Sequence, residues 1–279
     1  AEGIYKVKGT EDPLKTNESF GYNLPPKICG ENQELFEFFN KKMVNPYVLP
    51  RSCEFVPGCN ECQGFLCSLN CKNDSNNICI QPAINNYNAE LLTGVTVTKI
   101  NVRGNKVTGI ECIDKNNVLN IKMDILILAG GAISTPSLLL KSKNNNNAYG
   151  ISNQSGMVGE NLMRHCIDLY LIKTKNKPPS NGFLKEIAFN DFYNTEAFGR
   201  LGTFQSFGRL PPSDILILNL LEQFSFNINI IKRFLFISKI FDWYFTNRIG
   251  MNTIIEDLPY KENTIEVDRN SGVTKLTYK

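Results

Sequence analysis

Hydrophobic and polar residues alternate over one long stretch near the middle of the chain. Three segments show the period of two that is typical of half-buried strands. These segments are VTVTKINVR at 95–103, KVTGIECI at 106–113 and VLNIKM at 118–123. Gly104-Asn105 between the first two is a two-residue hairpin turn, and DKNN supplies the next turn. The pattern predicts a three-stranded antiparallel meander over residues 95–123.

The alternation then gives way to an unbroken apolar run, ILILA at 125–129, which ends at Gly130 and Gly131. A continuous run of this length predicts a buried strand with both faces covered, as in a parallel sheet. The glycines allow two interpretations. They either let the backbone approach a bound group closely, or form a tight turn that packs a helix on the strand.

A helix is predicted after the glycines, near residues 135–142. Ser134 or Thr135 is suited to cap its N-terminus, and Pro136 is suited to its first turn. Near the start of the chain, ENQELFEFFNKKM at 31–43 predicts another helix within an otherwise irregular segment. The polar loop KNNNNAYG at 143–150 precedes a second half with mixed strand and helix patterns.

Composition narrows the class of protein. The chain has 279 residues, 42% of them hydrophobic, which is enough for one large globular domain or two ordinary ones. Its 30 basic and 27 acidic residues give a net charge of +3, so we expect no nucleic-acid partner. Nine cysteines without a visible export signal indicate a reducing compartment, and we expect a cytoplasmic location.

The longest apolar region, residues 215–245, is interrupted by charged residues and should not cross a bilayer. Its basic and aromatic part near 230–248 is typical of helices packed inside a large domain. The alternative is contact with a membrane surface, as in a lipid-handling or sterol-handling protein.

The usual catalytic motifs are absent from the sequence. It contains no G-x-G-x-x-G, G-x-x-x-x-G-K-[ST], H-E-x-x-H or G-x-S-x-G. His165 is the single histidine, and a structural role is favoured for it over that of a base.

A dense cysteine run is the other chemical feature. Cys59, Cys62, Cys67 and Cys71 have the spacing C-x2-C-x4-C-x3-C, which is not the paired repeat of a zinc ribbon, so we assign no metal ligand. Free thiols or a disulfide are favoured over a metal cluster. The remaining cysteines are predicted to be buried small apolar residues: Cys29, Cys53, Cys79, Cys112 and Cys166.

Four segments together resemble the glucose-methanol-choline (GMC) oxidoreductases in order and spacing. They are AELLTGVTVTKI, KVTGIEC, DILILAGGAISTPSLLLKS and SGMVGENLMRH. Weaker similarity extends to AEGIYKVKG and to IIEDLPYKENTIEVDRNSG near the two ends. The resemblance implies an α/β fold, α+β overall, with part of an FAD-binding Rossmann-like domain that includes a β-meander, plus part of a substrate-binding domain. We expect a covering segment with the cysteine run at 1–79, the FAD-binding part at 80–166 and the substrate-binding part at 167–279.

The resemblance also implies cofactor-binding residues. Val97 would contact the adenine end of FAD, and the backbone of Ala129, Gly130, Gly131 and Ala132 would lie along the dinucleotide. The segment from Gly159 to His165 would mark the passage between the two domains.

The family oxidises CH-OH groups of alcohols or sugars by hydride transfer to flavin. Its first phosphate-binding loop and its C-terminal catalytic histidine have no counterpart in this sequence. We therefore expect the central part of a longer alcohol dehydrogenase or oxidase, inactive alone, with no catalytic residue to assign. The expected partners are a small alcohol or sugar and an electron acceptor such as oxygen, a quinone or a cytochrome. The alternative is a cysteine-rich redox or iron–sulfur module, because some sugar dehydrogenases of the family carry a cluster in this part of the chain.

Overall fold

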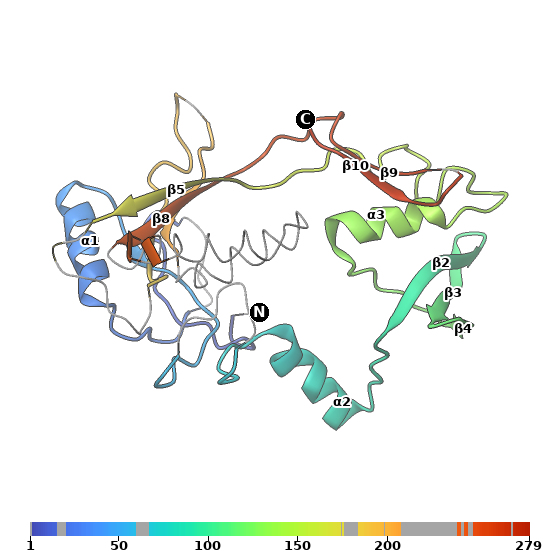
Figure 1. Ribbon diagram of the computed structural model, residues 1–279, viewed down its shortest axis with the longest axis horizontal. Helices are drawn as coiled ribbons and strands as arrows, with labels where there is room; N and C mark the ends of the chain where they lie inside the picture. Colours follow the sequence, from blue (N-terminus) through green and yellow to red (C-terminus); the bar gives the residue numbers. More distant parts are fainter. Residues whose placement is uncertain are drawn as a thin grey trace. The chain divides into compact units, whose positions relative to one another are not determined.

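A computed structural model describes most of the chain (Figure 1). The described residues are 2–15, 21–59, 67–173, 175, 184–197, 199–207, 239–240, 243–244, 248–268 and 270–279. The chain forms two compact units, and each unit combines two separate stretches of sequence. Unit 1 comprises Ala1–Ala89 and Cys166–Glu256, and unit 2 comprises Glu90–His165 and Asp257–Lys279.

Unit 1 contains an antiparallel sheet with the strand order β1-β6-β7-β8-β5. Its strands are β1 (Tyr47–Val48), β5 (Cys166–Ile172), β6 (Ile187–Phe189), β7 (Thr203–Ser206) and β8 (Ile249–Ile255). The β5 and β8 strands run side by side along their full length (Figure 1). The fully buried residues of β6 and β8 put the core of unit 1 on this sheet.

Helix α1 (Gly30–Lys41) packs its apolar face on that sheet, which confirms the helix predicted at 31–43. Leu35 lies in the core cluster with Ile187 and Ile249. The Phe189 ring stacks on that of Phe204, with centroids 4.9 Å apart, and it also contacts Phe39. Farther along the chain, η1 (Asn76–Ile80) continues directly into α2 (Gln81–Tyr87).

Unit 2 begins with the predicted meander, which the structure confirms. Its strands are β2 (Val95–Arg103), β3 (Lys106–Asp114) and β4 (Asn117–Lys122), paired antiparallel in that order. Gly104 has φ +59° at the first turn, a conformation that favours glycine. The register between β2 and β3 shifts after Val97, where β2 has an extra residue, and again after Asn101, where β3 has the extra residue.

The prediction of a buried strand at 125–129 is wrong. These residues form no strand, and Ile125 and Ile127 are 82% and 83% exposed. The apolar run shows that these residues favour a buried strand. A strand also needs a neighbouring strand to which its backbone can hydrogen-bond. Within the described residues no strand pairs with this segment, and most of its residues are exposed.

The helix after the glycines begins earlier than predicted. Helix α3 spans Gly131–Lys141, and Pro136 lies inside it instead of in its first turn. Neither Ser134 nor Thr135 caps the helix, because Gly130 holds the N-cap position without a side-chain hydrogen bond. Proline is best tolerated in a first turn because it lacks an N–H, and this preference placed the predicted start several residues too late.

Helix α3 packs on β2 and on β9 (Thr264–Val267), which pairs with β10 (Thr274–Thr277). The hydroxyls of Ser137 and Thr274 lie 2.6 Å apart, and the Ile100 N–H donates to Ser142 Oγ at 2.8 Å. The pair β9 and β10 therefore groups with residues 90–165 in unit 2. The FAD-binding and substrate-binding roles given to 80–166 and 167–279 remain predictions.

The basic aromatic segment near 230–248 lies almost entirely outside the described residues. None of the helices in the described part of the chain combines the length and the apolar composition that a membrane crossing requires.

Candidate functional site

The glycine turn at the start of α3 presents its backbone to solvent. Residues Ala129, Gly130, Gly131 and Ala132 are all exposed. Gly131 has φ +77°, and a Cβ there would meet open space, whereas a Cβ at Gly130 would lie 3.2 Å from Thr135 Oγ1. The first N–H groups of a helix have no partner within the helix, and the helix dipole is positive at that end. The turn can therefore accept an anionic group close to the backbone.

Val97 belongs to the same unit as the glycine turn. It is 37% exposed and lies on β2 at the first register shift of that strand. Because α3 packs on β2, the two parts of the predicted nucleotide site lie on elements that contact each other.

The residues around the turn fit a bound dinucleotide. The turn offers open backbone at Gly131 and uncapped helix N–H groups, as described above. Ile125, Ile127 and Ile133 add exposed apolar side chains on either side of the turn. Flat aromatic rings and phosphates need this combination of apolar surface and backbone donors.

The segment from Gly159 to His165 runs beside β9. The Ile265 N–H donates to the Gly159 carbonyl at 2.7 Å, and the Leu162 N–H donates to the Asn263 carbonyl at 2.9 Å. Gly159 has φ +92°, and a Cβ there would overlap the Ile265 carbonyl, so the close approach requires glycine. His165, the last residue of this segment, is exposed and ends the first stretch of unit 2.

A cluster of thiols lies in unit 1. The sulfur atom of Cys71 lies 3.5 Å from that of Cys59 and 3.9 Å from that of Cys53, and the Cys53 and Cys59 sulfur atoms are also 3.9 Å apart. Cys67 Sγ lies 3.4 Å from Cys71 Sγ. Cys59 and Cys71 are buried, and the described cysteines form no disulfide. Cys62 lies outside the described residues.

The spacing of cysteines in the sequence did not identify Cys53 as a member of the cluster. Cys53 reaches the cluster because its backbone pairs with a residue next to Cys71. Cys53 forms an antiparallel bridge with Lys72, and the neighbouring Glu54 N–H donates to the Cys71 carbonyl at 2.8 Å. The prediction that the scattered cysteines are buried is confirmed for Cys112. It is wrong for Cys79 and Cys166, which are exposed, and Cys53 and Cys29 are half-buried.

The thiols of the cluster differ in acidity. Burial raises the pKa of Cys53 and of Cys71. Burial also acts to raise the pKa of Cys67, but hydrogen bonds from the backbone and thiol of Cys71 outweigh it and bring the pKa of Cys67 to about 7.

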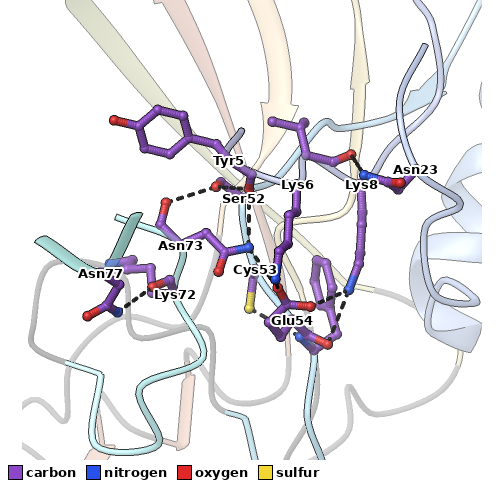
Figure 2. A network of polar contacts seen from close by, with 12 residues as sticks. Tyr5, Lys6, Lys8, Asn23, Ser52, Cys53, Glu54, Lys72, Asn73 and Asn77 are labelled. Carbon is purple, nitrogen blue, oxygen red and sulfur yellow. Dashed lines mark hydrogen bonds and ion pairs between the residues drawn. The ribbon is translucent and has the colours of Figure 1, made fainter. Parts of the chain in front are cut away.

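A polar network lies directly beside this cluster (Figure 2). Its centre is Glu54, which pairs with Lys8 at 3.0 Å and with Lys6 at 3.4 Å and accepts a hydrogen bond from Asn73 Nδ2 at 3.1 Å. The Ser52 hydroxyl donates to the Tyr5 carbonyl at 2.7 Å. The network joins the segment before β1 to both sides of the cysteine run. The hydrogen bond from Asn73 and the pairing with Lys8 lower the pKa of Glu54 to about 2.

We expect Glu54→Gln to lower the free energy of unfolding by about 1 kcal/mol at neutral pH, because a third of the side chain is exposed and solvent screens the ion pairs. The folded-state pKa lies below the ordinary 4.5, so the wild-type advantage is complete above that pH and disappears as the pH falls toward 2. Urea unfolding of both proteins across this range measures the difference. An equal difference at pH 3 and pH 7 would contradict the assignment.

Comparison with known proteins finds a family match for the central segment of the chain. Residues 48–167 match the family model for GMC oxidoreductases. The chain is 29% identical over 113 residues to 2-methyl-1,2-propanediol dehydrogenase of Mycolicibacterium austroafricanum, a match that covers 39% of this chain and 20% of that protein. It is 28% identical over 166 residues to oxygen-dependent choline dehydrogenase of Staphylococcus saprophyticus, covering 57% of this chain and 25% of that protein.

Among solved structures, the chain is similar to pyridoxine 4-oxidase from Mesorbium loti. The two share 12% identity with a TM-score of 0.48, and the match covers 84% of this chain and 41% of that one.

The meander, the glycine turn and the start of α3 all fall within the matched residues 48–167. Residues 48–167 therefore match the GMC oxidoreductase family, in agreement with the resemblance found in the sequence. The matched segment spans a fifth to a quarter of the length of the two curated relatives described above.

Proposed function

We propose that this chain contributes part of the FAD site of an oxidoreductase that acts on CH-OH groups of an alcohol or sugar. The observation that carries the proposal is the open glycine turn at the start of α3, inside the segment that matches the family. The open space at Gly131 and the helix N–H groups without a side-chain cap would let a phosphate approach the backbone closely.

The residues of the chain would bind and orient the cofactor. The backbone of Ala129 to Ala132 would lie along the dinucleotide, with the first N–H groups of α3 directed at its phosphates, and Val97 would contact its adenine end. FAD, when bound, accepts the hydride from the substrate carbon. The exposed apolar residues beside the turn would exclude water from one side of the cofactor. No residue of this chain is assigned a catalytic role.

The substrate class rests on the relatives. The two curated relatives are named as dehydrogenases of a diol and of choline, and both of these compounds carry a hydroxyl group. An alcohol or sugar hydroxyl is therefore the proposed reacting group. A cytochrome, a quinone or oxygen would take the electrons onward.

The protein that carries this chain is expected to purify with bound FAD, because the turn leaves backbone donors open for phosphate. Acid release followed by chromatography identifies the flavin and distinguishes FAD from FMN. Anaerobic addition of a panel of small alcohols and sugars should bleach the flavin absorbance with at least one of them. Flavin that none of the panel reduces would contradict the substrate class, and folded protein that neither contains nor takes up flavin would overturn the whole proposal.

A further inference from the structure

We propose that the thiol cluster of unit 1 binds a single zinc ion through Cys53, Cys59, Cys67 and Cys71. The zinc site and the proposed flavin site rest on different residues, because all four cysteines belong to unit 1 and the glycine turn belongs to unit 2. With four protein ligands it would leave no open position for a substrate, so its role would be structural.

The sulfur geometry matches a tetrahedral zinc site. Zinc–sulfur bonds of about 2.3 Å place the ligand sulfur atoms of a tetrahedron about 3.8 Å apart. The three separations among Cys53, Cys59 and Cys71 are 3.9, 3.9 and 3.5 Å. The point in their plane that is equidistant from all three lies about 2.2 Å from each, so an ion with zinc–sulfur bonds would sit slightly out of that plane, as a tetrahedral ion does.

Cys67 provides the fourth ligand. Its sulfur lies 3.4 Å from Cys71 Sγ but outside the group of three sulfur atoms that lie within 4.8 Å of one another, so its side chain would have to move toward the ion to complete the tetrahedron. Two backbone groups already donate to ligand sulfur atoms: the Cys71 N–H to Cys67 Sγ at 3.3 Å, and the Phe55 N–H to Cys53 Sγ at 3.4 Å. Donors of this kind stabilise metal-bound thiolates. Each thiol would release its proton to solvent when it binds the ion.

The local backbone is shaped to bring the four thiols together. Phe55 and Gly58 have φ of +53° and +81°, and these values turn the chain between Cys53 and Cys59. Asn70, with φ +51°, does the same between Cys67 and Cys71. Residues other than glycine rarely adopt a left-handed conformation. Two of them within this short segment indicate that the surrounding structure maintains the backbone conformation that brings the thiols together.

A disulfide or an iron–sulfur cluster accounts for the geometry less well. A disulfide joins only two sulfur atoms, at about 2.0 Å, whereas Cys71 Sγ lies within 3.9 Å of three others. A four-iron cluster binds each cysteine to a different iron and needs sulfur atoms spread around a cube. The sulfur atoms of Cys53, Cys59 and Cys71 converge on one point, and a single ion satisfies that arrangement.

The test is the metal content of the full chain purified from zinc-supplemented and iron-supplemented medium without chelators. We expect one zinc per chain, with iron and acid-labile sulfide below a tenth of that. Cys71→Ser and Cys59→Ser should reduce the zinc content at least tenfold. Cys79→Ser, at an exposed position of unit 1, and Cys112→Ser, at a buried position of unit 2, should each retain it.

Cobalt replacement keeps the test decisive if the ligand variants fail to fold. Wild-type protein with cobalt in place of zinc should show the intense visible bands of a tetrahedral thiolate site, and the weak spectrum of octahedral cobalt would overturn the proposal. Iron with labile sulfide, iron without sulfide, or metal-free protein with all these thiols titratable would each overturn it as well. Flavin content is measured on the protein that carries this chain, where zinc without flavin would support the zinc site while removing the proposed function, so the two failures are distinguishable.

Discussion

Glu186→Ala is expected to lower the free energy of unfolding by about 3 kcal/mol, because it leaves buried donors without an acceptor. The Glu186 side chain is 1% exposed and lies at the N-terminus of α1. Its Oε2 accepts hydrogen bonds from the Cys29 N–H at 2.9 Å and from Asn32 Nδ2 at 2.8 Å. The carboxylate therefore replaces the missing side-chain cap of α1 and complements the positive end of its dipole.

The backbone of Glu186 also connects two other parts of unit 1, strand β7 and the residue that follows β1. Its N–H donates to Ser206 Oγ of β7 at 2.8 Å, and its carbonyl accepts from the Leu49 N–H at 2.8 Å. The loss of the carboxylate should therefore be transmitted to the packing between α1 and the sheet. Urea unfolding followed by far-UV circular dichroism measures the effect.

Two variants serve as controls for Glu186. Glu37→Ala removes an exposed carboxylate from the same helix and should change stability by less than about 0.5 kcal/mol. Glu186→Gln retains one acceptor oxygen but places an amide against the same donors, so we expect an intermediate loss. Equal stability of the Glu186→Ala and Glu37→Ala proteins would show that the carboxylate does not cap α1.

Gly131→Leu is expected to raise the dissociation constant for FAD at least tenfold while the protein stays folded. A side chain at this position projects into open space beside the turn, where we place the dinucleotide. Leucine reaches well into that space without the crowding of a β-branched residue. FAD titration of the flavin-depleted protein, followed by flavin fluorescence, measures the change.

Backbone strain alone must be separated from this effect. Gly131 has φ +77°, so any side chain there costs about 1–2 kcal/mol of strain. Gly272 offers a matched control in the same unit, with φ +68° and no atom within 4 Å of its Cβ position. Gly272→Leu carries similar strain away from the proposed site and should leave FAD affinity within twofold of wild type.

Local pattern predicted the elements that need only their own residues and their immediate neighbours. The meander was predictable because its strands follow one another along the chain and are joined by short turns, so alternation and turn residues suffice. Helix α1 was predictable from its own apolar face. The conformation of the segment at 125–129 was not predictable. A buried strand depends on neighbouring strands, and the apolar run does not show whether such neighbours are present.

The candidate sites also divide into those that local sequence reveals and those that depend on residues distant in the sequence. The glycine turn could be found from the sequence because a glycine pair between an apolar run and a helix is a local signal. The thiol cluster could only partly be found. Cys59, Cys67 and Cys71 stood out by density, but Cys53 joins them through its bridge with Lys72, and no spacing rule contains that pairing. The role of Glu186 was equally hidden, since 157 residues separate it from Cys29.

The central claim is that FAD lies against the glycine turn of α3. The most direct test is the molar ratio of FAD to folded protein in the Gly131→Leu variant. This ratio is compared with that of wild type and of Gly272→Leu, purified in the same way. Circular dichroism first establishes that all three proteins are folded. We predict a ratio near the wild-type value for Gly272→Leu and below one-tenth of it for Gly131→Leu. Equal ratios in all three proteins would contradict the placement of FAD against the glycine turn of α3.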